Sequence, residues 1–298
     1  MIRGNRLTTK VLQISFVLLH SFVASAAPDF TVFPLQEDYE SGYFHGDIHE
    51  QIKRLSKQIK KDRKNPELYF QRAVLYHEHD EFRHARNDYH KAVKLGYKKP
   101  DVYYFLARLY KEWNENAEAL KNIDIFLGLQ RESVSGIVER GRILNQMKNY
   151  SAALTEYEKA FKLKNNLIPE YYLEATGVIL KRDTKDYDEA LQMLGRAIAD
   201  LGALSVFQDM ALDLELKKGD VDAALARLDA QAENLDRKEN HYARRADILA
   251  AAGRTEAARE YYRKALEAIE KLPGHRQKTP SVVELKGKII TSLNTLNH

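Results

Sequence analysis

Residues 137–163 read IVERGRILNQMKNYSAALTEYEKAFKL and hold two apolar runs separated by a short polar stretch. Within each run, small and apolar residues recur every three or four positions, which places them on one face of a helix. In order, they are Gly141, Leu144, Tyr150, Ala153, Tyr157, Ala160 and Leu163. Lys148 and Asn149 lie between the two runs. The stretch therefore predicts two helices joined by a tight turn.

The same pattern returns along the chain at a nearly constant interval. An alanine in an equivalent setting occurs at Ala85, Ala119, Ala153, Ala190, Ala224 and Ala258, and four of the five intervals are equal. One helix hairpin cannot bury its own apolar faces, so units of this length stack into an array. The fourth unit is longer by three residues near Lys181–Asp186, which predicts a longer turn between its helices. In the fifth unit, the spacing of Phe207, Met210, Ala211 and Leu214 predicts a one-residue offset of the first helix.

Small residues also pair across each hairpin at one fixed separation. The pairs, called the small-residue pairs below, are Ala73 and Ala85, Ala107 and Ala119, Gly141 and Ala153, and Ala246 and Ala258. Short side chains at these places let two helix axes approach closely, while aromatic residues fill the space around them.

These units resemble the tetratricopeptide repeats, whose pattern combines a period of about 34 residues with small and aromatic residues at set places. The third unit, quoted above, and the sixth carry the resemblance best; the sixth does so in Tyr242, Ala246, Leu249, Gly253, Ala258, Tyr262 and Ala265. The chain departs from the pattern where Arg72, Arg140 and Arg245 replace the usual leucine. The resemblance implies an all-α superhelical solenoid of six helix-turn-helix units over residues 65–272.

Each end of such an array needs an apolar cover. Ile48, Ile52, Leu55 and Ile59 form a stripe that predicts a capping helix over 48–64, whose other faces are rich in lysine. Val282, Leu285, Ile289 and Leu293 predict a second capping helix over 279–298, and Ser281 and Glu284 are spaced as a capping box at its start. Both helices are interpreted as covers for the ends of the array. For the basic helix, electrostatic binding to a membrane surface is the alternative.

The amino-terminal segment, residues 1–26, has the features of a secretory signal peptide. Arg3, Arg6 and Lys10 precede an apolar run over 11–23, and Ala24-Ser25-Ala26 has the small-x-small form of a cleavage site. We therefore expect cleavage near Ala26, an exported protein that is periplasmic or secreted, and no stable membrane insertion afterwards. A retained anchor is the alternative. The absence of cysteine suits an oxidising compartment.

The charge balance argues against a nucleic-acid partner. The whole chain has 47 Lys and Arg residues against 43 Asp and Glu residues, and three of the basic residues belong to the leader. The remaining charges nearly balance, whereas a nucleic-acid-binding protein typically carries a clear excess of basic residues.

Residues 27–47 follow the leader and combine acidic residues with five aromatic ones, Phe30, Phe33, Tyr39, Tyr43 and Phe44. They are interpreted as a flexible arm, or as a segment that folds onto the array or a partner.

Histidines are concentrated in the first unit. His77, His79, His84 and His90 occur among acidic residues, and imidazole and carboxylate groups are zinc or copper ligands. On the repeat pattern these side chains lie on different faces, so a polar surface turn is favoured and His77, His79 and His84 are weak metal candidates. His45, Asp47 and His49 form a second weak fragment. We expect no metal site, no cofactor and no catalytic residue, because neither a phosphate-binding glycine loop nor a nucleophile elbow is present.

Function in such an array depends on a surface. The resemblance implies that the first helices of successive units line a concave groove that holds a segment of another protein. The residues expected there are Phe70, Val74, Tyr104, Arg108, Lys111, Val138, Arg142, Asn145, Tyr172 and Thr176. Aromatic rings and guanidinium groups are the usual anchors of interfaces. The alternative is that some of these side chains pack between neighbouring units.

Two functions follow from these patterns. The first is an exported scaffold that binds a protein or peptide partner, within an envelope or secretion assembly or beside an exported enzyme. The second is a metal-binding or hydrolytic accessory built on the histidine-rich first unit. Neither the identity of the partner nor the oligomeric state follows from the sequence.

Overall fold

The computed structural model describes residues 48–233 and 235–296 of the chain. Within these ranges the secondary structure is helical and contains no strand. The expected signal peptide and the arm over 27–47 lie outside the described residues. Residues 55–298 form one compact unit, and the fold described below is the fold of that unit.

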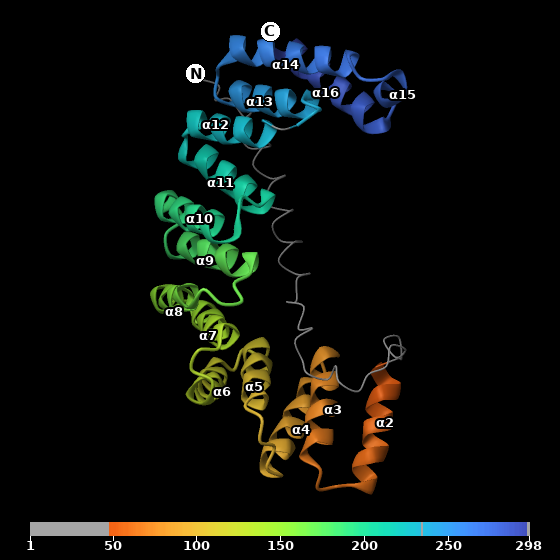
Figure 1. Cartoon of the computed structure of the whole chain (residues 1–298), viewed down its shortest axis with the longest axis vertical. Coiled ribbons are helices and arrows are strands. Elements are labelled where there is room, and N and C mark those ends of the chain that lie inside the picture. The colour runs from red at the N-terminus through yellow and green to blue at the C-terminus, as the bar shows by residue number, and fades with distance from the viewer. Residues whose placement is uncertain (1–47, 234, 297–298) are drawn as a thin grey trace, which may run out of the picture. The chain divides into compact units, whose positions relative to one another are not determined.

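Six antiparallel helix hairpins follow one another along the described chain (Figure 1). Their helices are α3 (Pro66–Glu78) and α4 (Phe82–Lys94), α5 (Asp101–Glu112) and α6 (Asn116–Leu129), α7 (Val134–Gln146) and α8 (Tyr150–Leu163), α9 (Pro169–Arg182) and α10 (Tyr187–Leu201), α11 (Ser205–Lys218) and α12 (Val221–Ala232), and α13 (Glu239–Ala251) and α14 (Thr255–Glu270). The first helix of each later hairpin also packs on the second helix of the hairpin before it. The predicted all-α repeat solenoid is confirmed.

Five of the six turns inside the hairpins contain a residue in the left-handed region; the turn of the fourth hairpin, over 183–186, does not. Asp80, Asn114 and Lys148 have φ values of 59°, 59° and 62°, and Gly219 and Gly253 have φ values of 85° and 73°. A left-handed residue ends the first helix and lets the chain reverse into the second. Side chains then cap several second helices. In the third unit, for example, Asn149 Oδ1 accepts a hydrogen bond from the backbone N–H of Ala152 at 3.4 Å.

The extra residues of the fourth unit lie in a different place from the one expected. Helix α9 continues to Arg182, eleven residues beyond Tyr171, whereas α7 ends nine residues beyond the equivalent Ile137. Two of the three extra residues therefore prolong α9, and one lengthens the turn over 183–186. In the fifth unit the one-residue offset is present, and Phe207, Ala211 and Leu214 of α11 are buried.

Close helix packing at the small residues forms the core. Each alanine of the small-residue pairs is fully buried, with 0% of its surface exposed. At Gly141 a Cβ atom would lie 3.3 Å from Tyr157 Cε2 and 3.4 Å from the carbonyl oxygen of Ala153. The two helices of the third hairpin are thus in contact at the backbone, as the sequence predicted.

The arginines that replace leucine tie neighbouring helices together. Arg140 donates to Asp124 at 2.8 Å and to Glu156 at 2.9 Å, which lie on α6 and α8 at equal separations before and after it in the sequence. Arg72 makes the same bridge between Ser56 and Asp88, at 2.9 and 2.6 Å. A long guanidinium side chain spans two hairpins where leucine would pack within one.

Helices also lie at both ends of the array. Helix α2 (Ile48–Lys61) precedes the first hairpin, and its Leu55 and Ile59 are buried. After the short α15 (Gly274–Gln277), α16 (Pro280–Leu296) packs on α13 and α14 through Val282 and Ile289. Because α16 begins at Pro280, Ser281 lies inside the helix and not at the predicted N-cap. No helix among the described residues is long and apolar enough to cross a lipid bilayer.

Candidate partner-binding face

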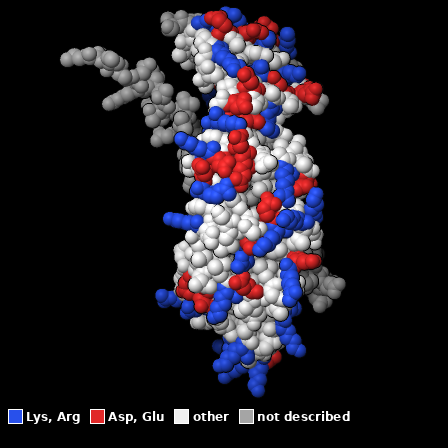
Figure 2. Space-filling model, turned by 90° about the vertical axis from the view of Figure 1, so that its left-hand side faces the viewer, with Lys and Arg blue, Asp and Glu red and all other residues white. Residues whose placement is uncertain are grey.

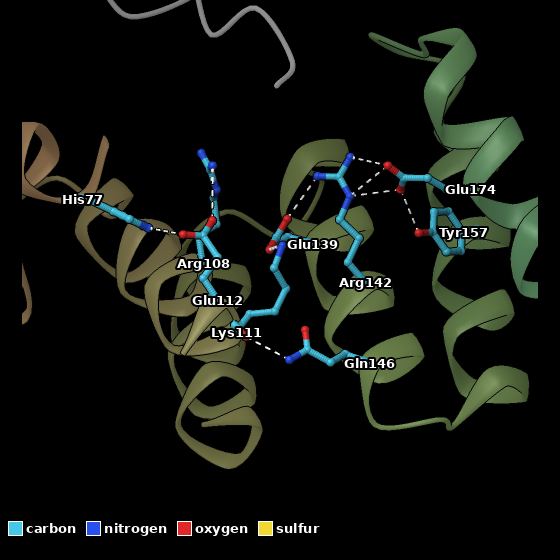
Figure 3. Close-up of polar contacts among 9 residues, drawn as sticks. All are labelled: His77, Arg108, Lys111, Glu112, Glu139, Arg142, Gln146, Tyr157 and Glu174. Carbon is cyan, nitrogen blue, oxygen red and sulfur yellow. Dashed lines mark hydrogen bonds and ion pairs between the residues drawn. The ribbon is translucent and has the colours of Figure 1, made fainter. Parts of the chain in front are cut away.

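Polar side chains form a ladder across the first helices of the first four hairpins. We call this surface the first-helix face. Figure 3 shows its residues His77, Arg108, Lys111, Glu112, Glu139, Arg142, Gln146 and Glu174, together with Tyr157 of α8, which contacts Glu174. Asn145 of α7 belongs to the same face. The side chains come from α3, α5, α7 and α9, and α5 packs directly on α3 and on α7. The contacts therefore connect one repeat to the next.

The first contact joins α3 to α5. His77 is buried, and its Nε2 atom lies 2.8 Å from Glu112 Oε2. The other oxygen of Glu112 lies 3.7 Å from Arg108 Nη2, one helical turn earlier. Burial alone would raise the pKa of Glu112, but the hydrogen bond from His77 and the nearby positive charges outweigh it and lower the pKa. Glu112 is thus held as a carboxylate.

Glu139 is the buried centre of the ladder. It is 0% exposed, and its Oε1 atom lies 2.6 Å from Lys111 Nζ while its Oε2 atom accepts from Arg142 Nη1 at 3.1 Å. Burial would raise the pKa of this carboxyl group, but the charges of Lys111 and Arg142 prevail and lower it. A carboxylate fully removed from water is stable only when it is paired in this way. The Glu139 side chain therefore requires both cations.

Arg142 continues the ladder to the fourth hairpin. Its Nε and Nη2 atoms donate to the two oxygens of Glu174 on α9, at 3.0 and 2.9 Å. Tyr157 of α8 donates its hydroxyl to the same carboxylate at 2.9 Å. This fork-to-fork pairing fixes the plane of the guanidinium group. Gln146 adds a separate link, because its Nε2 atom donates to the Lys111 carbonyl oxygen at 2.9 Å.

The structure divides the residues expected in the groove into two sets. Phe70, Tyr104, Val138, Tyr172 and Thr176 are buried, with exposed fractions from 0% to 5%. Phe70 stacks on Tyr97 at 4.5 Å, and Tyr172 stacks on Phe161 at 4.1 Å, so these rings pack between neighbouring units. Arg108, Lys111, Arg142, Asn145 and Val74 are half-buried and reach the surface. The accessible part of the face is consequently polar, and its aromatic part supports it from beneath.

The histidines of the first unit do not meet at one place. His77 turns to Glu112, whereas His84 Nδ1 lies 3.1 Å and His79 Nδ1 3.8 Å from the carboxylate of Glu81. Among the described residues, no group of three or more His, Asp or Glu side chains has the arrangement of a metal site. His45 and Asp47 lie outside the described residues.

The counter-charges of the ladder were missed by sequence reasoning. Glu139 and Glu174 were not among the residues expected on this face. A signal was present, since Glu174 follows Arg142 by 32 residues, which is close to one repeat. Neighbouring repeats bring residues at such separations together.

Comparison with known proteins identifies the repeat. Residues 136–167 and 242–271, in the third and sixth hairpins, match the family model of the tetratricopeptide repeat. A tetratricopeptide repeat protein from Parabacteroides merdae shares 20% identity over 82% of this chain and 93% of its own, with a TM-score of 0.50. The C-terminal part of a TPR repeat-containing protein from Cytophaga hutchinsonii shares 13% identity over 80% and 94% of the two chains, with a TM-score of 0.60. No curated protein sequence matches the chain.

Proposed function

We propose that this chain, which belongs to the tetratricopeptide-repeat proteins, is an exported scaffold that holds a segment of a partner protein on its first-helix face. Members of this family typically bind other proteins. The finer proposal concerns the surface that binds and the compartment in which it works.

The observation that carries the proposal is the position of two arginines: Arg142 is fixed by hydrogen bonds to Glu139 and Glu174, and Arg108 lies 3.7 Å from Glu112 on the same face. The side chains of Arg108 and Arg142 are 26% and 20% exposed, so part of each guanidinium group reaches solvent while glutamates hold the rest. An arginine that is already ordered loses little entropy when it binds, and its remaining N–H groups can donate to carbonyl or carboxylate oxygens of an extended segment. Asn145 lies beside them on the same face and is half-buried.

The ladder also favours binding over catalysis. Its carboxylates are Glu112, Glu139 and Glu174, and each is engaged by a cation or a hydroxyl group of the same surface. A general base needs a free lone pair within reach of a substrate proton. These carboxylates instead orient the donors that surround them.

Export rests on the amino-terminal sequence. The basic residues, the apolar run over 11–23 and the site at Ala24–Ala26 favour removal of the leader and work in the periplasm or outside the cell. We place the partner in the same compartment, in an envelope or secretion assembly or beside an exported enzyme. Intact-mass measurement of the exported protein tests this part, and a chain that keeps its leader in the membrane fraction would contradict it.

Capture of the partner from the native envelope tests the binding surface. The parent protein, an Arg108→Ala variant and a Lys121→Ala variant are compared as baits; Lys121 is exposed on α6, a second helix. Loss of an interface arginine costs about 2 kcal/mol or more, so Arg108→Ala should weaken capture about 30-fold while Lys121→Ala leaves it unchanged. The proposal fails if the Lys121 variant loses the partner and the Arg108 variant keeps it.

A further inference from the structure

Basic side chains gather at one edge of the first hairpin. Nine of them lie in two short stretches, namely Lys57, Lys60, Lys61, Arg63 and Lys64, and Lys91, Lys94, Lys98 and Lys99. All nine are exposed. Figure 2 shows Lys and Arg gathered at its lower end, where Figure 1 places the α2–α3 and α4–α5 connections. We call these nine residues the basic edge.

The two stretches are neighbours in space. Tyr69 of α3 donates its hydroxyl to the Arg63 carbonyl oxygen at 3.3 Å, which holds the α2–α3 connection against the start of α3. Lys99, in the α4–α5 connection, lies 3.7 Å from Glu67 in the first turn of the same helix. The start of α3 therefore joins both connections, and the nine cations form one surface.

Little negative charge offsets this surface. The acidic residues in and beside the two stretches are Asp62, Glu67 and Asp101. Among the residues that the structure describes, Lys99 is the one member of the basic edge with an ion pair. Elsewhere in the array, by contrast, several arginines pair with acidic side chains of the same or a neighbouring hairpin.

Helix ends do not account for so many cations. Lysines in the last turn of a helix interact favourably with its dipole, which suits Lys60 and Lys61 of α2 and Lys91 and Lys94 of α4. The remaining five lie before the last turn or in the connections. Their mutual repulsion opposes folding, so the array gains no stability from placing them together.

The composition of the edge points to a lipid ligand. Eight of the nine residues are lysines, which act as point charges, and the edge offers one arginine and no exposed aromatic ring for base stacking. Such a surface suits a dense, geometrically undemanding array of negative charge. From this we propose that the basic edge docks the array on a membrane surface rich in anionic lipid headgroups.

The test is co-sedimentation of the full chain with vesicles that contain phosphatidylcholine and about 30% phosphatidylglycerol, an anionic lipid. Each lysine near such a surface contributes about 1 kcal/mol, and the attraction is screened by salt. A variant with five edge lysines changed to glutamine should therefore bind at least about 100-fold more weakly; the changes are Lys57→Gln, Lys61→Gln, Lys64→Gln, Lys94→Gln and Lys98→Gln. Binding of the parent should also fall steeply as salt rises.

A charge-matched control separates the edge from net charge. It carries five exposed lysines elsewhere as glutamine, namely Lys121→Gln, Lys162→Gln, Lys181→Gln, Lys185→Gln and Lys271→Gln, and it should bind as the parent does. A second edge variant, Lys98→Gln with Lys99→Gln, changes no helix residue and should lose about tenfold or more. Circular dichroism shows whether the five-lysine variant is folded. If that variant unfolds, the two-lysine variant still tests the proposal.

Three outcomes would overturn the proposal. The edge variants could bind the anionic vesicles as tightly as the parent. The parent could bind pure phosphatidylcholine vesicles equally well, which would assign binding to the apolar run over 11–23. A single-stranded oligonucleotide or a polyglutamate peptide could compete fully with the vesicles at matched charge, which would assign the edge to a different class of ligand.

Discussion

At the scale of single residues, three hairpin turns hold a residue other than glycine in the left-handed region. Lys148 is the costliest of these, because a long side chain at a φ of 62° crowds its own carbonyl group, whereas Asn114 belongs to a residue type that tolerates this conformation. Lys148→Gly should raise the free energy of unfolding by about 0.5–1 kcal/mol, net of the entropy that glycine adds to the unfolded chain. Asn114→Gly should raise the free energy of unfolding by a smaller amount. Urea unfolding measures both variants, and a gain for Lys148→Gly no larger than that for Asn114→Gly would contradict this view of the turns.

The second prediction at this scale concerns Glu139 and pH. The pKa of Glu139 is lowered in the folded protein, so its ion pairs stabilise the fold above the ordinary glutamate pKa of about 4.3 and are lost as the pH falls through the lower folded value. Glu139→Gln leaves Lys111 and Arg142 without their shared carboxylate and should cost about 2–4 kcal/mol at neutral pH.

The stability of the Glu139→Gln variant should also depend less on pH than that of the parent. The measurement is the free energy of unfolding at pH 7 and at pH 3. Its decrease between the two pH values should be smaller in Glu139→Gln than in the parent, because one carboxylate with a lowered pKa has been removed. Glu170→Gln on α9 is a suitable control, since Glu170 is a first-turn glutamate outside the ladder. An identical acid dependence in all three proteins would show that Glu139 is not the buried carboxylate described above.

At the scale of helices, close packing depends on the small residues. Ala153 is fully buried where α7 and α8 meet, so Ala153→Leu should force the helices apart and cost about 1–3 kcal/mol. Ala252 is exposed at the end of α13, and the same change there should cost less. Thermal unfolding followed by circular dichroism compares the two. Equal melting temperatures would mean that the small-residue pairs do not set the helix spacing.

The elements themselves were largely predictable, because each hairpin repeats one local pattern. The period of Ala85, Ala119 and Ala153 places the helices, and the glycines at 219 and 253 mark turns that need a positive φ. The end of α9 was not predictable in this way. A helix gains a backbone hydrogen bond with each added residue, so α9 continues through Lys181 and Arg182 to Asp183, where the backbone turns extended.

At the scale of the whole array, the candidate site was only partly predictable. The sequence indicates which residues stand on first helices, and Arg108, Lys111 and Arg142 do reach the surface there. The sequence does not show how far each ring is covered by the next hairpin. Tyr104 and Tyr172 were therefore expected at the surface, whereas both are buried in the structure. Inter-repeat contacts such as Arg142 with Glu174 depend on the rotation between neighbouring hairpins, which no local pattern encodes.

The most direct test of the scaffold account is site-specific photo-crosslinking in cells that express the protein naturally. A photoreactive amino acid replaces Gln146, which is exposed on the first-helix face, or Lys121, which is exposed on the second helix α6. Neither position is buried, so both variants should fold as the parent does. The account predicts that a protein partner is crosslinked from position 146 and not from position 121. A partner crosslinked from position 121 alone would contradict it and assign binding to the second helices.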